Sequence, residues 1–179
     1  MGRLLPVADP VHSPGGDIPI TEMFGHGIIT GGLFLVVGML SEQAGLRDLR
    51  QLTGAMKRAP VFVVIFSIFM FGSMAMPGLM GFWGELYILL GAYPKIRLGA
   101  ALSALGIAFT AGFFIWALQR MAFGETTPAT ETLTDIKAND IWSIAPLLFL
   151  MFFFGFFPAF YLTPWVGALN QLGMYLVRH

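Results

Sequence analysis

Glu85 is an acidic residue in an otherwise apolar stretch, residues 76–87. A carboxylate at bilayer depth costs about 2.5 kcal/mol or more, and acids within membrane spans usually mark paths for ions or protons. A carboxyl group that has lost its hydration can bind and release a proton near neutral pH. We therefore predict that Glu85 carries protons. The alternative is a carboxylate that only accepts hydrogen bonds at a helix N-terminus, where the helix dipole favours negative charge.

His26 and Glu22 lie four residues apart and therefore share one face of a predicted helix. Imidazole is the side chain whose unperturbed pKa lies nearest neutrality, so we predict that His26 passes protons toward Glu85. The alternative for His26 is a side chain packed between helices and bonded to a backbone carbonyl. Glu22 is a candidate for the point where protons enter or leave, and its place near the end of the span favours an ordinary interfacial acid.

The composition indicates an integral membrane protein. Of the 179 residues, 56% are hydrophobic and 11% are charged, and the mean hydropathy is +0.76. These values exclude a soluble domain of this length. Ten basic residues balance ten acidic ones, so the net charge gives no reason to expect nucleic acid as a partner.

The sequence contains no residue set for independent catalysis or for a bound cofactor. It has no cysteine, which excludes disulfides, Cys-ligated iron–sulfur clusters and thiolate zinc sites. The three histidines, His12, His26 and His179, occur in unlike settings and do not indicate haem. Catalytic triads, phosphate-binding loops and metal-spaced clusters are also missing from the sequence. We expect no catalytic, cofactor-binding or metal site in this chain.

Hydropathy predicts an all-α bundle of about four transmembrane helices between residues 20 and 162. A crossing needs about 20 mostly apolar residues. The predicted spans are residues 20–40, 60–93, 98–123 and 141–162. The third span is rich in glycine, alanine and serine, which let helices approach closely. We therefore expect that span to be buried among its neighbours.

The second predicted span is too long for one crossing and too short for two, and Pro77 explains this length. Proline has no N–H to donate, and its ring clashes with the preceding helical turn. Together with Gly78 and Gly81 it predicts a helix that is split into two halves. Irregular backbone at bilayer depth is tolerated only where protein or water satisfies its polar groups. The break should therefore face a bundle or a cavity.

The remaining segments are predicted to lie outside the spans. Residues 1–19 combine prolines, glycines and charges, which predicts a polar, non-spanning head that is not a signal peptide. Basic residues in the loop 41–59 place that loop in the cytoplasm and at lipid headgroups. Residues 163–179 predict an interfacial tail because the segment is shorter than a crossing. The phenylalanines of residues 152–158 are expected to face lipid or to pack between helices.

Several sequence elements occur together in an order typical of one family. They are Phe24-Gly25-His26-Gly27 at the start of a span, Arg47-Asp48-Leu49-Arg50 in the next loop, residues 54–60 with Lys57 and Arg58, and residues 76–85 around Pro77 and Glu85. In this combination the chain resembles the antiporter-like subunit M of respiratory complex I, called subunit 4 in mitochondria. The resemblance covers about residues 22–158. Related cation/proton antiporter subunits usually carry lysine at the position of Glu85, so the glutamate favours the complex I branch.

The resemblance implies a proton-translocating subunit of a membrane arm. Such subunits have fourteen spans in two inverted repeats, each with a broken helix, and this chain is similar to the last four spans. Glu85 is similar to the glutamate of the second broken helix, at the end of the proton path. His26 is similar to the histidine that relays protons toward it. The lysine–glutamate pair of the first repeat and the central lysine have no counterpart in this sequence.

The leading hypothesis is proton translocation in the membrane arm of an NADH:quinone oxidoreductase-like complex, with this chain as half of a split subunit M. NADH, flavin, iron–sulfur clusters and quinone are then expected in partner chains, another chain supplies the missing N-terminal spans, and lipids surround the bundle. The expected location is a bacterial or archaeal cell membrane or an organellar inner membrane. Two alternatives stay open: a subunit of a multi-chain cation/proton antiporter, and a non-conducting structural piece of the arm.

Overall fold

Helices form most of the described chain, which comprises residues 18–44 and 52–160 of a computed structural model. The long helices are α1 (Ile18–Ala44), α4 (Arg97–Phe123) and α6 (Ala138–Phe156), and each is long and apolar enough to cross a membrane. The shorter ones are α2 (Pro60–Ser73), α3 (Met80–Ala92) and the single turns η2 (Ala55–Lys57) and α5 (Pro128–Glu131). The prediction of an all-α membrane protein is confirmed for these residues.

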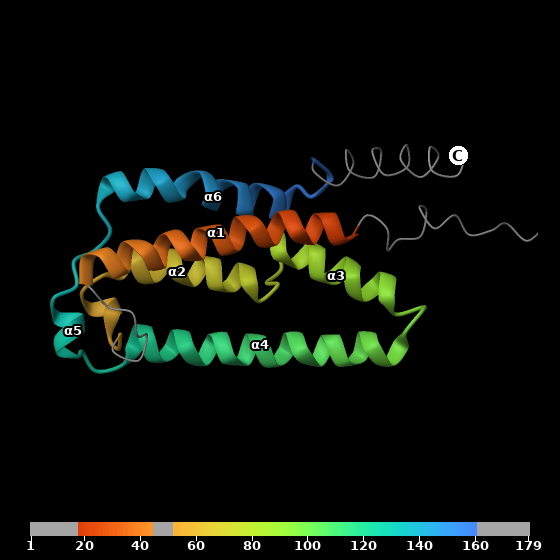
Figure 1. Ribbon diagram of the computed structural model, residues 1–179, viewed down its shortest axis with the longest axis horizontal. Coiled ribbons are helices and arrows are strands. Elements are labelled where there is room, and N and C mark those ends of the chain that lie inside the picture. The colour runs from red at the N-terminus through yellow and green to blue at the C-terminus, as the bar shows by residue number, and fades with distance from the viewer. Residues whose placement is uncertain (1–17, 45–51, 161–179) are drawn as a thin grey trace, which may run out of the picture.

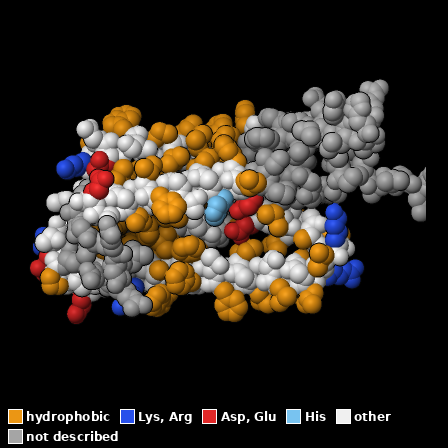
Figure 2. Space-filling model, viewed as in Figure 1, with side chains coloured by type: hydrophobic (Ala, Val, Ile, Leu, Met, Phe, Trp, Pro, Cys, Tyr) orange, Lys and Arg blue, Asp and Glu red, His pale blue; other side chains and the backbone are white. Residues whose placement is uncertain are grey.

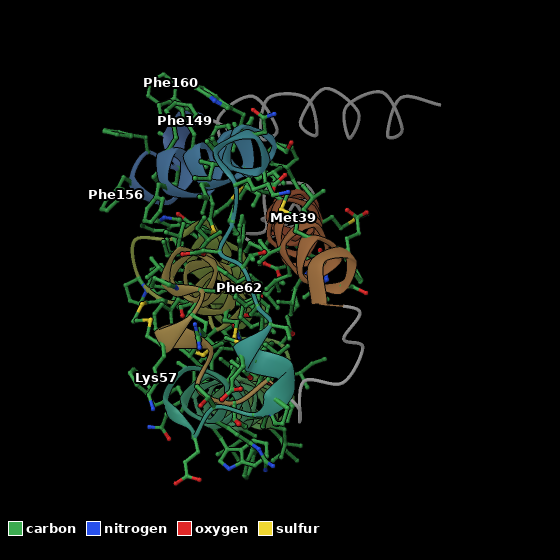
Figure 3. All side chains as sticks on the ribbon, turned by 90° about the vertical axis from the view of Figure 1, so that its left-hand side faces the viewer. Met39, Lys57, Phe62, Phe149, Phe156 and Phe160 are labelled. Atoms are coloured by element: carbon green, nitrogen blue, oxygen red, sulfur yellow. The ribbon has the colours of Figure 1, made fainter. Side chains whose placement is uncertain are left out.

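The helices form an antiparallel bundle in which α2 and α3 follow each other end to end (Figure 1). α1 runs against α2 and α3 and contacts both, and α6 lies against α1 and α3. In the end-on view of Figure 3, α6, the pair α1 and α2, and α4 follow one another as layers. Val36, Phe69, Ile144 and Met151 are fully buried. The best-packed part of the bundle is therefore the junction of α1, α2 and α6.

The second span is broken around Pro77, as predicted. α2 has 14 residues and α3 has 13, so each half is about 20 Å long. Neither half alone crosses the hydrocarbon layer, which is about 30 Å thick. Ala75 and Gly78 in the connection have positive φ angles of 52° and 92°, and glycine adopts such angles without strain from a Cβ.

Backbone hydrogen bonds inside the break replace those of a continuous helix. The N–H of Met76 donates to the carbonyl of Phe71 at 3.2 Å, and the N–H of Leu79 donates to the carbonyl of Met76 at 3.1 Å. These turns satisfy backbone groups that would otherwise be left without partners at bilayer depth.

Glycines let the neighbouring backbone close over the break. A Cβ at Gly81 would collide with the carbonyl oxygen of Gly72, and one at Gly155 of α6 would collide with the carbonyl oxygen of Gly78. The indole N–H of Trp83 donates to the carbonyl of Gly155 at 2.7 Å. The break is therefore enclosed by protein on the side of α6, which agrees with the expectation that it faces a bundle.

The predicted burial of the third span is wrong within this chain. Large apolar side chains of α4 point outward, and Phe109 is 78% exposed. The helix contacts η2 near its C-terminal end and α3 near its N-terminal end (Figure 1), and a Cβ at Gly106 or Gly112 would meet open space. Small residues permit close approach, but they do not supply the helix that approaches. Lipid or another chain must cover this surface.

A set of polar side chains holds the end of the bundle near η2 and α5, and we call Thr53, Thr130 and Asp135 the polar clasp. The two carboxylate oxygens of Asp135 accept hydrogen bonds from the N–H groups of Val61 and Phe62, each at 3.0 Å. These N–H groups belong to the first turn of α2, and N–H groups in the first turn of a helix have no hydrogen-bond acceptor within that helix. The buried hydroxyl of Thr130 donates to the carbonyl of Thr53 at 2.9 Å.

Several sequence predictions lie outside the described residues. They concern the head, part of the first loop and the tail, which fall in residues 1–17, 45–51 and 161–179. The aromatic run can be followed to its end: Phe156 and Phe157 are exposed, and Figure 3 shows Phe149, Phe156 and Phe160 on the outer side of α6. An outer aromatic surface of this kind suits contact with lipid.

Candidate functional site: an acidic seam beside the broken helix

One face of α1 lies along α3 directly after the break. Glu22, Gly25 and Ile29 follow the three- and four-residue spacing that places side chains on one helical face. A Cβ at Gly25 would lie 3.4 Å from Cγ of Met80, and Cδ1 of Ile29 lies 3.2 Å from the position of a Cβ at Gly81. The helices therefore meet through glycines, which bring Glu22 to the next turn of α3.

Glu22 reaches α3 at Gly84. A Cβ at Gly84 would collide with Oε2 of Glu22 and would lie 3.1 Å from its Cα. Oε2 of Glu22 is buried in this contact. The sequence favoured an ordinary interfacial acid at this position, and the structure differs because the missing side chain of Gly84 leaves room for the carboxylate between the helices.

Glu85 follows Gly84 on α3, and its Oε2 is buried as well. Neither buried oxygen, of Glu22 or of Glu85, has a hydrogen-bond partner within the described residues. The two carboxyl groups are close enough to interact electrostatically. Buried polar atoms without partners are uncommon in proteins and call for an explanation in function, such as an ion, a proton or a water molecule.

His26 lies one helical turn from Glu22, with which it also interacts electrostatically. Its side chain is exposed in the described chain, so the structure gives no support to the alternative of a histidine packed between helices of this chain. Figure 2 shows histidine and acidic side chains next to one another near the middle of the described surface, while the lysines and arginines lie toward the two ends of the molecule. We call Glu22, His26, Gly84 and Glu85 the acidic seam.

The break positions the acidic seam. Pro77 and Gly78 lie in the connection, and Gly81 lies in the first turn of α3. Glu85 is in the second turn of α3, where its Oε2 accepts no hydrogen bond from the described residues, and the N-cap residue Leu79 provides no side-chain cap. These contacts give no support to the helix-cap alternative for Glu85.

Gly84 is a member of the site that the sequence did not predict. The only available signal was its place directly before Glu85 in a glycine-rich stretch, and that signal does not tell which side chain fills the space.

Metal binding is not indicated, since residues 18–44 and 52–160 contain no group of three or more histidine, aspartate or glutamate side chains that could hold an ion.

Residues 13–110, which include the whole acidic seam, match the transmembrane family described as NADH:quinone oxidoreductase/Mrp antiporter. The chain belongs to this family. The structure is also similar to a chain of respiratory complex I from Thermus thermophilus with bound NADH. The TM-score is 0.75, and the identity is 29% over a match that covers 90% of this chain and 35% of that chain.

Curated relatives of this chain come from several kinds of organism. NADH-quinone oxidoreductase subunit M of Rickettsia conorii is 36% identical over 78% of this chain and 29% of its own length. F(420)H(2) dehydrogenase subunit M of Methanosarcina mazei is 30% identical over 77% of this chain and 28% of its own length. NADH-ubiquinone oxidoreductase chain 4 of Chondrus crispus is 29% identical over 80% of this chain and 30% of its own length. The chain thus spans less than a third of the length of these three curated relatives.

Proposed function

We propose that this chain conducts protons as part of an antiporter-like subunit in the membrane arm of an NADH:quinone oxidoreductase-like complex. The observation that carries the proposal is the pair of buried carboxyl oxygens of Glu22 and Glu85, which have no hydrogen-bond partner among the described residues and lie beside a broken helix. Acids of this kind within a membrane bundle mark proton or ion paths. The relatives named above support the choice of complex.

Redox chemistry is assigned to other chains of the complex. This chain has no cysteine, and complex I chemistry needs NADH, flavin, iron–sulfur clusters and quinone. The exposed apolar side of α4 suits the spans that full-length relatives possess in addition, whether these spans belong to the same polypeptide or to a separate one, as in a split subunit.

The test uses the assembled complex in sealed vesicles, with proton uptake per electron pair as the readout. Glu85→Gln removes the titratable group and keeps the shape of the side chain, so assembly and quinone reduction should persist while proton uptake falls. Glu42→Gln is the matched control, because Glu42 is an exposed acid on α1 and its replacement should leave proton uptake unchanged. Wild-type proton uptake in Glu85→Gln would overturn the proposal and favour a structural piece of the arm.

The same vesicle preparation also tests the alternative function, cation/proton antiport. If the subunit moves protons only, replacing sodium and potassium by an impermeant organic cation should leave proton uptake unchanged. A requirement for either ion in the wild-type complex would favour the antiporter alternative.

A further inference from the structure

The proposed path needs a connection between α1 and α3, and Glu22 is placed to provide it. Glu22 interacts electrostatically with His26 on its own helix and with Glu85 on the other. Its Oε2 is buried at Gly84, the residue that precedes Glu85. No other described side chain is shown to interact with both His26 and Glu85.

We propose that Glu22 is the proton carrier between His26 and Glu85, and that Gly84 is the positioning residue that lets the Glu22 carboxyl lie in the seam. This inference rests on the proposed function and names a further residue of the same path. It differs from the sequence prediction, in which Glu22 marked only a point where protons enter or leave.

The transfer consists of two single-proton steps without electron movement. The protonated imidazole of His26 gives its proton to the carboxylate of Glu22, which becomes a carboxylic acid. Glu22 then gives that proton to the carboxylate of Glu85 and returns to its first state. Neither buried Oε2 atom is engaged by a described donor, so no described hydrogen bond has to be broken before either oxygen takes part in the transfer.

A structural role for Glu22 would leave a different pattern of contacts. Acids that stabilise a fold have their oxygens bonded, as Asp135 does when it accepts from Val61 and Phe62. Oε2 of Glu22 is buried without such a bond. An interfacial acid would instead keep that oxygen in water, whereas Oε2 of Glu22 is buried against Gly84.

The first experiment replaces Glu22 by glutamine in the assembled complex and measures proton uptake per electron pair. We expect proton uptake to fall to the level of Glu85→Gln, and the double variant to fall no further because both residues serve one path. Quinone reduction should persist. Infrared difference spectra should also lose a carboxyl band in Glu22→Gln, which a merely structural acid would not contribute. Glu42→Gln again serves as the control.

The outcomes of this experiment separate the two proposals. Wild-type proton uptake in Glu22→Gln together with a loss in Glu85→Gln overturns the carrier role of Glu22 and leaves the proposed function intact. Wild-type proton uptake in both variants overturns the proposed function itself. A loss in Glu22→Gln that adds to the loss in Glu85→Gln overturns a single shared path.

The second experiment tests Gly84 through Gly84→Ala, which places a methyl group where Oε2 of Glu22 lies. We expect reduced proton uptake and partial recovery when Glu22→Asp shortens the acid in the same complex. Gly27→Ala is the control, because a Cβ at Gly27 meets open space. If Gly84→Ala does not assemble, recovery of assembly by Glu22→Asp is the readout. Unchanged proton uptake in Gly84→Ala, or no recovery with Glu22→Asp, overturns the positioning role.

Discussion

The acidic seam and the polar clasp are two polar clusters of one helical bundle, and they treat their carboxylates in opposite ways. Asp135 of the clasp places both oxygens on backbone N–H groups at 3.0 Å. Glu22 and Glu85 of the seam each bury an oxygen that has no partner among the described residues. The clasp joins segments that are 74 residues apart in sequence, whereas the seam lies where two helices cross beside a break.

The difference separates polar groups that hold the fold from polar groups that are available for transport. A hydrogen bond to a charged group stabilises a protein by about 1.5–3 kcal/mol, and a buried polar atom without a partner costs about 1–3 kcal/mol. The clasp therefore stabilises the bundle, and the seam lowers its stability. A protein keeps such a cost where an ion, a proton or a water molecule must be bound and released.

The largest loss of stability is expected from Gly155→Ala, which would separate α6 from the break beside the seam. Its Cβ would collide with backbone at Gly78, and overpacking that forces backbone to move costs up to about 3 kcal/mol and occasionally more. The measurement is the midpoint of thermal dissociation of the assembled complex. Gly27→Ala is the control because a Cβ at Gly27 of α1 meets open space. Equal midpoints for Gly155→Ala and Gly27→Ala would contradict the close contact between Gly155 and Gly78.

Asp135→Asn should lower stability by about 2 kcal/mol and leave proton uptake per electron pair unchanged. One oxygen of the amide still accepts a hydrogen bond, but its NH₂ group would face an N–H of the first turn of α2 and leave that donor without an acceptor. Thermal dissociation and proton uptake are measured on the same preparation. Lower proton uptake in complexes that remain assembled would show that the clasp also serves transport.

Thr130→Val should cost about 1 kcal/mol, since it removes a buried hydroxyl that donates to the carbonyl of Thr53 and bonds the hydroxyl of Thr127, while it keeps the volume of the side chain. The effect should be smaller than that of Asp135→Asn because the lost bonds are between neutral groups. Thr110→Val is a suitable control, since Thr110 bonds only to a carbonyl of its own helix in the described contacts. If Thr130→Val and Thr110→Val lower stability equally, the hydroxyl of Thr130 does not stabilise the polar clasp.

The smallest change in stability is expected from Glu85→Gln, which should shift it by about 0.5 kcal/mol or less. No hydrogen bond to the buried Oε2 is lost, because the described residues make none, and the amide oxygen of glutamine would be buried without a partner in the same way, so the cost is similar before and after the change. Paired with Asp135→Asn it gives the same chemical change at two acids. A destabilisation equal to that of Asp135→Asn would mean that Glu85 holds the fold, and the comparison would fail.

Local sequence determined the positions of the spans, the break at Pro77 and the acid that follows it. Apolar length decides whether a helix can cross a bilayer, and proline interrupts a helix whatever surrounds it, so both features are properties of a short stretch of chain. Glu85 and His26 became candidate site residues in the same way, because a titratable residue in an apolar stretch stands out without knowledge of its neighbours.

Only the tertiary structure decided which helices meet and what faces what. The contact of Glu22 with Gly84 depends on the height at which α1 crosses α3, and the bonds of Asp135 to α2 depend on the return of a distant loop. Composition suggested that α4 is buried, yet Phe109 and its neighbours lie exposed in this chain. Small and apolar residues make a helix able to pack, but the partner is set by the relative placement of whole helices, which no local pattern contains.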